Sequence, residues 1–398
     1  MSVVLYDDAR ARAFEPFALT RPASEMRVGA VLMRRRWERA LETMATGMVV
    51  ASHLREFEEP DTPPILHDEV PAGTVLANAR CAVTLDAITG PDAWRCEGRI
   101  AAVRLATPLA IGELQGGELD IASLVHPGAK VADVIGWWID DVWDYIRFLP
   151  ALLEHDIECL AEALELERGL HLTKLGAYPA YVERGARIDP FVLFDCLAGP
   201  ILVRRGASVA AFTRLVGPCA IGPESQVLGG RITVSSIGDG CRVAGDVSHT
   251  IFVGHGNKAH EGFVGHSMLG RWVNLGASTV TSNLKNTYGS VALWTPGGLR
   301  DTGLQFLGTL AGDHVKTAVG ARLTTGCVLG TGANVFGEGT TSKVVEPFAW
   351  GHHGTERYDL DRFLAVAERA MVRRSVVLTP RMRRTLERAY ERRWAPAP

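Results

Sequence analysis

An apolar residue recurs at every sixth position through the middle of the chain. The runs with this spacing are Val182, Ile188 and Phe194; Val203, Val209, Leu215, Ile221 and Val227; Ile237 and Val243; Phe263, Leu269 and Leu275; Leu323, Leu329 and Val335. This period fits neither an α-helix nor a flat strand with alternating faces. It is typical of a parallel β-helix with triangular coils, in which each side is one short strand. One coil cannot bury its apolar residues alone, so the pattern predicts a stack of coils.

Glycine usage marks where this stack begins and ends. Most of the 42 glycines lie between Gly176 and Gly351, as expected for a solenoid whose corners turn sharply. The stretch 281–312 does not keep the period, which predicts a loop excursion from one corner. We therefore predict three parts, with boundaries at residues 1–175, 176–351 and 352–398.

The residues before the repeat have an α/β pattern. The apolar run 3–6 predicts a buried strand, and residues 25–43 predict a helix. Residues 131–166 predict two helices separated by Pro150.

Apolar stripes predict a helical tail over residues 355–394, and Thr379 followed by Pro380 is typical of a helix start. Arginine outnumbers Asp and Glu in this tail. Its arginines either form a solvated helix face or contact the phosphates of a coenzyme or sugar.

Composition narrows the class of protein. The 398 residues are 47% apolar and 22% charged, which excludes a disordered, collagen-like or coiled-coil chain. A net charge of −3 argues against a general nucleic-acid binder. We expect no membrane span and no signal peptide. Seven dispersed cysteines without a Cys-x-x-Cys pair fit a reducing compartment, so we predict a cytoplasmic protein with neither a disulfide frame nor a thiolate zinc site.

Four histidines lie close together in the sequence: His249, His255, His260 and His266. Neutral imidazoles are good zinc ligands, so one interpretation is a metal site of the carbonic-anhydrase type. The other is one general base among structural histidines, since a histidine with a pKa near 6.5 accepts a proton at neutral pH. Only Glu261 lies close enough in the sequence to complete a ligand set, so we favour the general base and predict no resident metal.

The segment 258–283, KAHEGFVGHSMLGRWVNLGASTVTSN, carries a more specific pattern. It resembles the acetyltransferase half of the bifunctional family that acetylates glucosamine 1-phosphate and then forms UDP-N-acetylglucosamine. That family has Lys-Ala-Gly-His, then Asn-Ile-Gly-Ala-Gly-Thr, then Cys-Asn-Tyr. His260, the run Asn274-Leu275-Gly276-Ala277, and Asn283 fall at the matching positions without gaps.

The resemblance implies roles for these residues. It makes His260 the catalytic base, places Asn274 and Asn283 against sugar or acetyl groups, and places Ala277, beside Gly276, at the thioester of acetyl-CoA. It also implies a left-handed β-helix and a homotrimer with acyl sites between neighbouring prisms. The chain departs from the family at Phe263, where the family has tyrosine, and at Gly289, where it has lysine; Lys285 is the nearby substitute that we predict.

The N-terminal part resembles the companion nucleotidyltransferase half of that family, in a divergent branch. The family's Gly-x-Gly-Thr-Arg loop and its activating lysine are missing after the strand 3–6. The remaining motif, Thr20-Arg21-Pro22 with Arg27, and the later Asn78-Ala79-Arg80 are the predicted phosphate-binding elements, because guanidinium groups match phosphates. Candidate Mg²⁺ ligands are Asp7, Asp8 and Asp86.

These observations predict a fold class and a function together. We expect an α/β nucleotidyltransferase-like domain, a left-handed β-helix and a short helical tail. The predicted activity is acetyl transfer from acetyl-CoA to a sugar phosphate or amino sugar, beside a domain that binds or forms a sugar nucleotide with Mg²⁺. Three alternatives stay open: nucleotidyl transfer alone, a sugar-nucleotide sensor or scaffold without activity, and a zinc enzyme.

Overall fold

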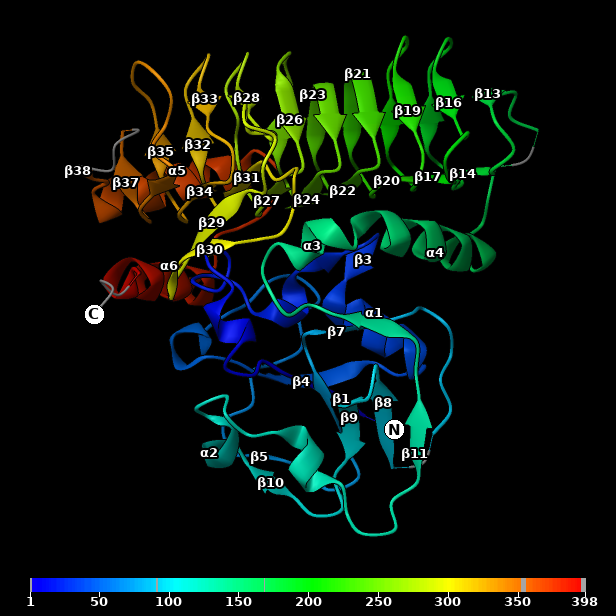
Figure 1. Ribbon diagram of the computed structural model, residues 1–398, viewed down its shortest axis with the longest axis vertical. Coiled ribbons are helices and arrows are strands. Elements are labelled where there is room, and N and C mark those ends of the chain that lie inside the picture. Colours follow the sequence, from blue (N-terminus) through cyan, green and yellow to red (C-terminus); the bar gives the residue numbers. More distant parts are fainter. Residues whose placement is uncertain (1, 91, 168, 352–355, 395–398) are drawn as a thin grey trace.

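The computed structural model describes residues 2–90, 92–167, 169–351 and 356–394. A mixed sheet forms the N-terminal domain, and a long triangular prism of coils lies across it (Figure 1). In order across the N-terminal sheet, the strands are β11 (Val131–Asp133), β8 (Ala93–Cys96), β9 (Arg99–Arg104), β6 (Val75–Asn78), β1 (Val3–Tyr6) and β4 (Ala45–Val49). Strand β1 is parallel to both of its neighbours, β4 and β6, so their carboxyl ends meet at one edge.

Short elements complete this domain. Its helices are α1 (Met33–Ala40), α2 (Ile111–Leu114), α3 (Asp144–Arg147) and α4 (Leu149–Glu162), with 3-10 turns at Ala11–Ala13, Ala23–Glu25, Ser52–Leu54 and Ile121–Leu124. Three strand pairs lie outside the main sheet: β2 (Arg27–Val28) with β3 (Val31–Leu32), β5 (Glu69–Val70) with β10 (Leu109–Ala110), and β7 (Cys81–Val83) with β12 (Gly136–Trp138).

Two of the predicted helices are shorter than expected. The helix predicted over 25–43 begins only at Met33, because Gly29 adopts φ +62° and turns the chain into the β2–β3 pair. Residues 131–138, predicted as helix, form strands β11 and β12, because the edges of β8 and β7 pair with them. Pro150 lies in the first turn of α4 rather than between two long helices.

The solenoid is a left-handed parallel β-helix with three faces. The domain-facing face holds β14 (Ala180–Val182), β17 (Ile201–Val203), β20 (Cys219–Ile221), β22 (Ser236–Asp239), β24 (Ile251–Gly254), β27 (Met268–Leu269), β31 (Thr309–Ala311), β34 (Cys327–Leu329) and β36 (Val344–Val345). The outer face holds β13 (Thr173–Leu175), β16 (Leu193–Asp195), β19 (Arg214–Val216), β26 (Phe263–Gly265), β28 (Val280–Thr281) and β33 (Arg322–Leu323).

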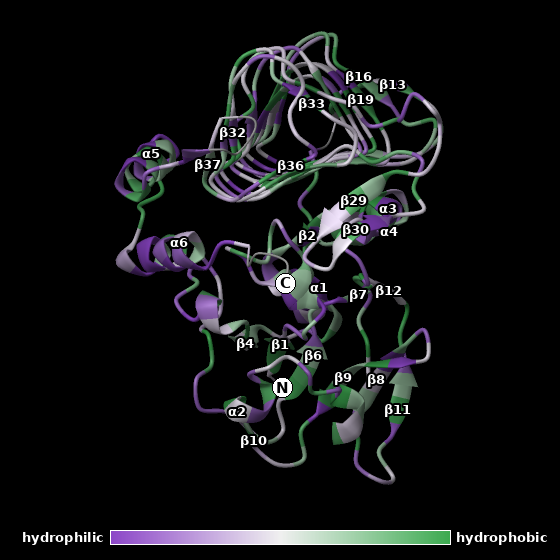
Figure 2. Cartoon of the chain, turned by 60° about the vertical axis from the view of Figure 1, so that its left-hand side comes forward, coloured by the Kyte–Doolittle hydropathy of each residue, from purple (hydrophilic) through white to green (hydrophobic). Residues whose placement is uncertain are grey.

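The third face is the tail-facing face, which lies beside the C-terminal helix α5 (Leu360–Val372) (Figure 2). It holds β15 (Arg187–Ile188), β18 (Ser208–Val209), β25 (Asn257–Lys258), β32 (Lys316–Thr317), β35 (Asn334–Val335), β37 (Ala349–Trp350) and β38 (Glu356–Arg357). Strands β21 (Gln226–Thr233) and β23 (Arg242–Ser248) bend across a corner and serve both this face and the outer face.

The sixfold period places apolar residues inside the prism, as predicted. Val203, Leu215 and Leu329 are among the fully buried residues of one continuous core. Phe263 is an exception, because Val264 lies inside instead and is separated from the next core residue, Leu269, by five residues rather than six. The predicted excursion is confirmed, and it contains the hairpin β29 (Ala292–Thr295) and β30 (Gly298–Asp301).

Helix α4 and the domain-facing face of the solenoid share a second apolar core. Leu152 and Leu153 of α4 pack with Leu202, Ala220 and Ile251 of that face. The tail forms helices α5 (Leu360–Val372) and α6 (Pro380–Arg392), and Thr379 caps α6 by accepting a hydrogen bond from Met382 N at 3.2 Å. Within the described ranges, no helix combines the length and the apolar character that crossing a membrane requires.

Candidate functional sites

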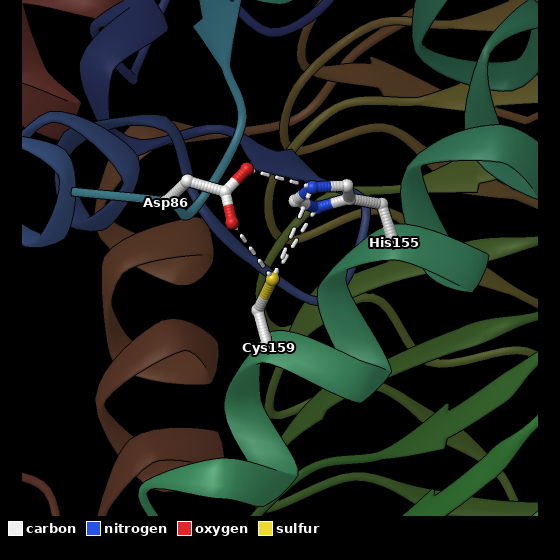
Figure 3. A group of neighbouring side chains, drawn as sticks. All are labelled: Asp86, His155 and Cys159. Atoms are coloured by element: carbon white, nitrogen blue, oxygen red, sulfur yellow. Dashed lines mark hydrogen bonds and ion pairs between the residues drawn. The ribbon is translucent and has the colours of Figure 1, made fainter. Parts of the chain in front are cut away.

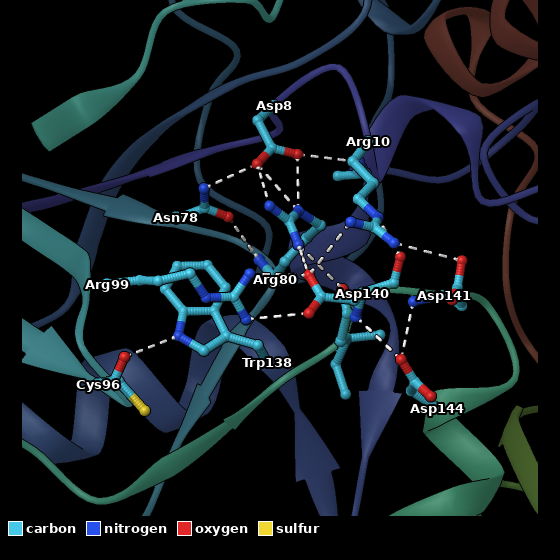
Figure 4. A network of polar contacts seen from close by, with 12 residues as sticks. Asp8, Arg10, Asn78, Arg80, Cys96, Arg99, Trp138, Asp140, Asp141 and Asp144 are labelled. Atoms are coloured by element: carbon cyan, nitrogen blue, oxygen red, sulfur yellow. Dashed lines mark hydrogen bonds and ion pairs between the residues drawn. The ribbon is translucent and has the colours of Figure 1, made fainter.

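Charged side chains gather where β1 and β6 end (Figure 4). Asp8 follows β1, and Asn78 ends β6. The Arg80 Nε donates to both carboxylate oxygens of Asp8, at 2.8 and 2.9 Å, and Asn78 Nδ2 donates to Asp8 Oδ2 at 2.9 Å. Parallel strands bring their carboxyl ends together, which is where α/β sheets bind ligands.

A second aspartate completes this strand-end site. Asp140 Oδ1 accepts from Arg80 Nη1 at 2.6 Å, and both of its oxygens accept from Arg99 at 3.0 Å. The Arg99 guanidinium also lies 4.0 Å from the ring centroid of Trp138. The residues around this group line a cavity of about 520 Å³, into which the half-exposed Arg10 and Arg99 open. The site therefore presents ion-paired arginines, together with the carboxylates of Asp8, Glu118 and Asp120, toward a cavity of small-molecule size.

The two aspartates that follow β1 differ in the direction in which their surroundings shift the pKa. Burial raises the pKa of Asp8, but the hydrogen bonds and charge of Arg80 outweigh it and leave that pKa below its usual value. Asp7 is buried, and desolvation raises its pKa to about 7. Asp7 Oδ2 accepts from Ala23 N at 3.0 Å, so this residue anchors the loop after β1. The predicted Mg²⁺ ligands are not gathered, because Asp86 contacts His155 and Cys159 instead.

The motif Thr20-Arg21 lies at the junction of the two domains. Arg21 is 2% exposed and donates to Glu59 at 2.6 and 2.9 Å and to Asp313 of the solenoid at 3.1 Å. Thr20 Oγ1 donates to the same Asp313 carboxylate at 3.2 Å. Arg271 of the solenoid donates to Glu59 at 2.9 Å, which closes the network.

Arg27 also reaches across the junction, to Asp239 Oδ1 at 2.9 Å. Thr20, Arg21 and Arg27 thus hold the domains together and are not brought to Arg80. The predicted role of these residues in phosphate binding stays a prediction.

His260 lies at the corner between the tail-facing and outer faces of the solenoid. Its side chain is exposed, and among the described residues none forms a hydrogen bond with the ring. Two residues earlier, Lys258 points into the prism, 1% exposed, and donates to Ala244 O at 3.1 Å and to His260 O. Burial lowers the pKa of Lys258 to about 8. This buried lysine fixes the backbone that carries His260.

Sequence reasoning missed Lys258, although the spacing held a signal. Lys258 lies six residues after the buried Phe252 and six before the buried Val264, which is the inward register of the repeat. An ionisable residue at an inward position of an apolar repeat is costly to bury unless it has partners.

The other predicted acyl-site residues lie on different parts of the solenoid. Asn274 Oδ1 accepts from Asn257 Nδ2 at 2.8 Å on the tail-facing face. Asn283 Nδ2 lies 2.9 Å from His266 Nδ1 at another corner, and Lys285 donates to Ser290 O at 3.0 Å in the exposed excursion.

Gly276, expected at the thioester, donates its N–H to Thr317 Oγ1 at 3.0 Å, so this N–H is already used within the solenoid. Its neighbour Ala277 accepts from Gly320 N at 2.7 Å in the same corner column. Within one chain, no hydrogen bond between described residues links these positions to His260. The acyl-transfer roles stay predictions.

The remaining histidines form two stacked columns. His249 and His266 stack with ring centroids 4.5 Å apart, and His255 stacks on Trp272 at 4.2 Å. Burial lowers the pKa of His255 and of His266 to about 4. These rings are therefore neutral at physiological pH, and their stacking gives them a packing role along the corners.

Comparisons with known proteins agree with the N-terminal geometry. Residues 3–164 match the family model described as sugar nucleotidyl transferase. The bifunctional protein GlmU of Rippkaea orientalis is 28% identical over 104 residues, which make up 26% of this chain. The match spans 22% of that relative's length, about a fifth.

Proposed function

We propose that the chain is a divergent member of the GlmU-like family and that its N-terminal domain transfers a nucleotidyl group to a sugar 1-phosphate. The observation that supports this most directly is the strand-end site. It lies inside the matched region and joins Asp8, Arg80 and Arg99 around one cavity.

In the proposed reaction, a phosphate oxygen of the sugar 1-phosphate attacks the α-phosphorus of a nucleoside triphosphate. The new P–O bond forms as the bond to the β-phosphate breaks, and pyrophosphate leaves with the electron pair. Arg99 and Arg10 face the cavity and stabilise the negative charge that develops on the phosphates. Arg80 has its donors committed to Asp8 and Asp140, so it positions those two carboxylates.

Magnesium enters this scheme with the nucleotide, as part of the substrate. Carboxylate oxygens such as those of Asp8 and Asp140 are ligands that suit Mg²⁺. Each of these carboxylates also accepts a guanidinium hydrogen bond. The phosphate-cradling glycine loop of the family is absent, and here Asp8 Oδ1 accepts the N–H of Ala11 at 2.9 Å. In the proposed site, charged side chains therefore stabilise the phosphates, as backbone N–H groups do in such loops.

The test is pyrophosphate release from a panel of nucleoside triphosphates and sugar 1-phosphates with Mg²⁺. We expect Arg99→Met to lower kcat by about 10²- to 10³-fold, because it removes one preorganised positive group. Arg95→Met is the matched control, since Arg95 lies on the adjacent strand and pairs with Asp133 on the surface. Equal rates for the wild type and Arg99→Met, or no turnover with any pair, would refute the proposal.

We propose acetyl transfer on the solenoid as a second function, supported by the surroundings of His260. The edge that carries His260 also carries large exposed apolar side chains: Phe191 is 73% exposed, Phe212 80% and Val319 75%. The rings of Phe191 and Phe212 stack 5.5 Å apart. Apolar side chains at one edge fit contact with a second copy of the chain, beside which the exposed imidazole acts as general base.

Thiol release from acetyl-CoA with a panel of amino sugars and sugar phosphates tests this function. His260→Ala is expected to reduce turnover by about 10²- to 10⁴-fold. His126→Ala, another exposed histidine in the N-terminal domain, is the control and retains the wild-type rate. Sedimentation should give a trimer that Phe212→Ser weakens. Turnover that His260→Ala leaves unchanged would exclude this mechanism.

A further inference from the structure

A positively charged cavity of about 300 Å³ lies between α5 and the tail-facing face of the solenoid. Five cationic side chains line it: Arg242, Lys316, Arg369, Arg373 and Arg374. They come from two separate parts of the chain, the coils and the tail, that pack against each other only in the folded protein. No carboxylate occurs among the described residues that line the cavity.

The cations of this cavity have no counter-charge within the described chain. None of the five forms an ion pair there, although Arg242, Lys316 and Arg374 are half-buried; Arg369 and Arg373 are exposed at the rim of the tail helix. Arg242 Nε is shielded from solvent and has no hydrogen-bond partner. Lys316 donates only to Trp272 O, at 3.3 Å, and burial lowers its pKa to about 8. Partly desolvated, unpaired cations are costly, and an anionic ligand removes that cost.

We propose that this cavity binds a small molecule with at least two linked phosphates. A single phosphate carries at most two charges near neutral pH, too few for five surrounding cations. Asn257 and Asn274 also line the cavity, and amide groups of this kind suit hydroxyl groups such as those of a sugar. Trp272 also lines the cavity, and its buried ring stacks against His255. Because the cavity belongs to the solenoid, this inference is separate from nucleotidyl transfer at the strand-end site.

Isothermal titration of the full chain with inorganic pyrophosphate, inorganic phosphate, UDP and coenzyme A tests the inference. We expect pyrophosphate to bind at least about 10-fold more tightly than phosphate, with an affinity that falls as salt rises. Arg242→Gln and Lys316→Met should each weaken binding by about 10- to 100-fold.

Arg187→Gln is the matched control. Arg187 lies in the same register on the same face, three coils before Arg242, but pairs with Asp189 outside the cavity. The inference fails if none of the probes binds, or if binding persists unchanged in both cavity variants. UDP or coenzyme A binding more tightly than pyrophosphate would support the proposal and identify the carrier of the phosphates. A loss of pyrophosphate release that is confined to Arg99→Met bears on nucleotidyl transfer at the strand-end site and leaves the proposal for this cavity unaffected.

A separate cluster of side chains in the N-terminal domain supports a second inference, a metal site. His155 and Cys159 lie one turn apart on α4, and Asp86 in the loop after β7 points toward both (Figure 3). His155 Nε2 is 3.0 Å from Asp86 Oδ2 and 3.9 Å from Cys159 Sγ, and Sγ is 3.5 Å from Asp86 Oδ1. Tetrahedral zinc, with bonds of about 2.0–2.3 Å, separates its ligand atoms by about 3.3–3.8 Å.

The geometry points to a zinc-class divalent cation held by these three residues, with a fourth position open to water. Nitrogen, sulfur and oxygen donors together suit zinc better than Mg²⁺ or Ca²⁺. Arg39 prepares the site, because it donates to Leu85 O at 3.1 Å and to Cys159 O at 2.6 Å. One guanidinium thus ties the loop of Asp86 to the helix that carries the other two ligands, as second-shell groups do in metal sites.

Cobalt(II) and zinc titrations of tag-free, chelator-treated protein test this site. We expect one Co²⁺ per chain with a thiolate charge-transfer band, displaced by one equivalent of Zn²⁺, and a higher Tm with zinc. Cys159→Ser should abolish the band, and His155→Gln should weaken binding by at least about 100-fold. His171→Gln, an exposed histidine elsewhere, should bind as the wild type does. No stoichiometric binding, or binding that both ligand variants retain, would overturn the assignment.

Discussion

Cationic side chains are used in opposite ways at two places in the molecule, the core of the N-terminal domain and the cavity beside α5. In the N-terminal domain, Arg36 is 0% exposed and forms an ion pair with the equally buried Asp156. On the solenoid, Arg242 and Lys316 line a cavity in which no described carboxylate reaches them. A buried pair that satisfies itself fixes the fold, whereas a set of unpaired cations is complete only when an anion arrives.

The junction between the domains resembles the N-terminal domain in this respect. Arg21 and Glu59 on one side meet Arg271 and Asp313 on the other, so each charge has a partner across the boundary. Two arginines and two acids balance in charge. The network therefore positions the solenoid against the sheet and needs no ligand.

Removing one partner of a buried pair gives the largest expected effect. Arg36→Met leaves Asp156 buried without its counter-ion and removes hydrogen bonds to Val28 O and Val83 O. We expect the free energy of unfolding to fall by about 3–5 kcal/mol. Urea denaturation at neutral pH measures this loss.

The neighbouring Arg35 provides the control for that comparison. Its side chain is 37% exposed and pairs with Glu38, which is buried and keeps Arg34 as a second partner. Arg35→Met is expected to cost only about 0–1 kcal/mol, because Arg35 is partly solvated and its removal leaves Glu38 paired. Similar losses for both variants would contradict the view that burial makes the Arg36 pair structural.

The next largest expected effect is a loss of stability in acid, when Glu59 at the junction becomes protonated. Burial opposes ionisation of Glu59, but Arg21 and Arg271 outweigh it and lower the pKa of Glu59 from 4.5 to about 2. A carboxyl whose pKa is depressed on folding stabilises the protein above its unfolded pKa. This contribution, about 3 kcal/mol, is lost as the pH falls from about 4.5 to 2.

Glu59→Gln should therefore be less stable than the wild type at neutral pH, and the gap should close at about pH 2. Urea denaturation of both proteins across this range measures the gap. An undiminished gap in acid would show that lost packing, rather than lost charge, explains the variant.

The sequence predicted the solenoid well because its repeat is local. Each coil buries an apolar residue at the same interval, and residues such as Val209 and Leu329 lie where the period puts them. Prediction failed where distant pairing decides the structure. Residues 131–138 have a helix-like pattern, yet the open edges of β7 and β8 pair with them as strands.

The candidate sites were less predictable for the same reason. Asn78 and Arg80 were expected to belong together from one short motif, but Asp140 joins them only because β12 returns to β7. The spacing of His155 and Cys159 on one helical face was readable from the sequence. Asp86, which completes the cluster, lies about seventy residues earlier in the sequence, so its contact with these two residues could not be predicted.

Titration of Lys316 gives a smaller effect. Stability rises with pH in both cases, but the charged form of Lys316 destabilises the fold, whereas the charged form of Glu59 stabilises it. Burial lowers the pKa of Lys316 from 10.5 to about 8, so the unfolded chain binds more protons between these values. Stability without ligand should therefore rise with pH over this window, by about 1–3 kcal/mol.

Lys316→Met should lose this rise. At neutral pH the variant should be as stable as the wild type or more so, because the substitution leaves no carboxylate without its partner. Unfolding free energies of both proteins between about pH 7 and 10 measure the difference, and a clear loss of stability in Lys316→Met at neutral pH would mean that the lysine has a partner within the fold.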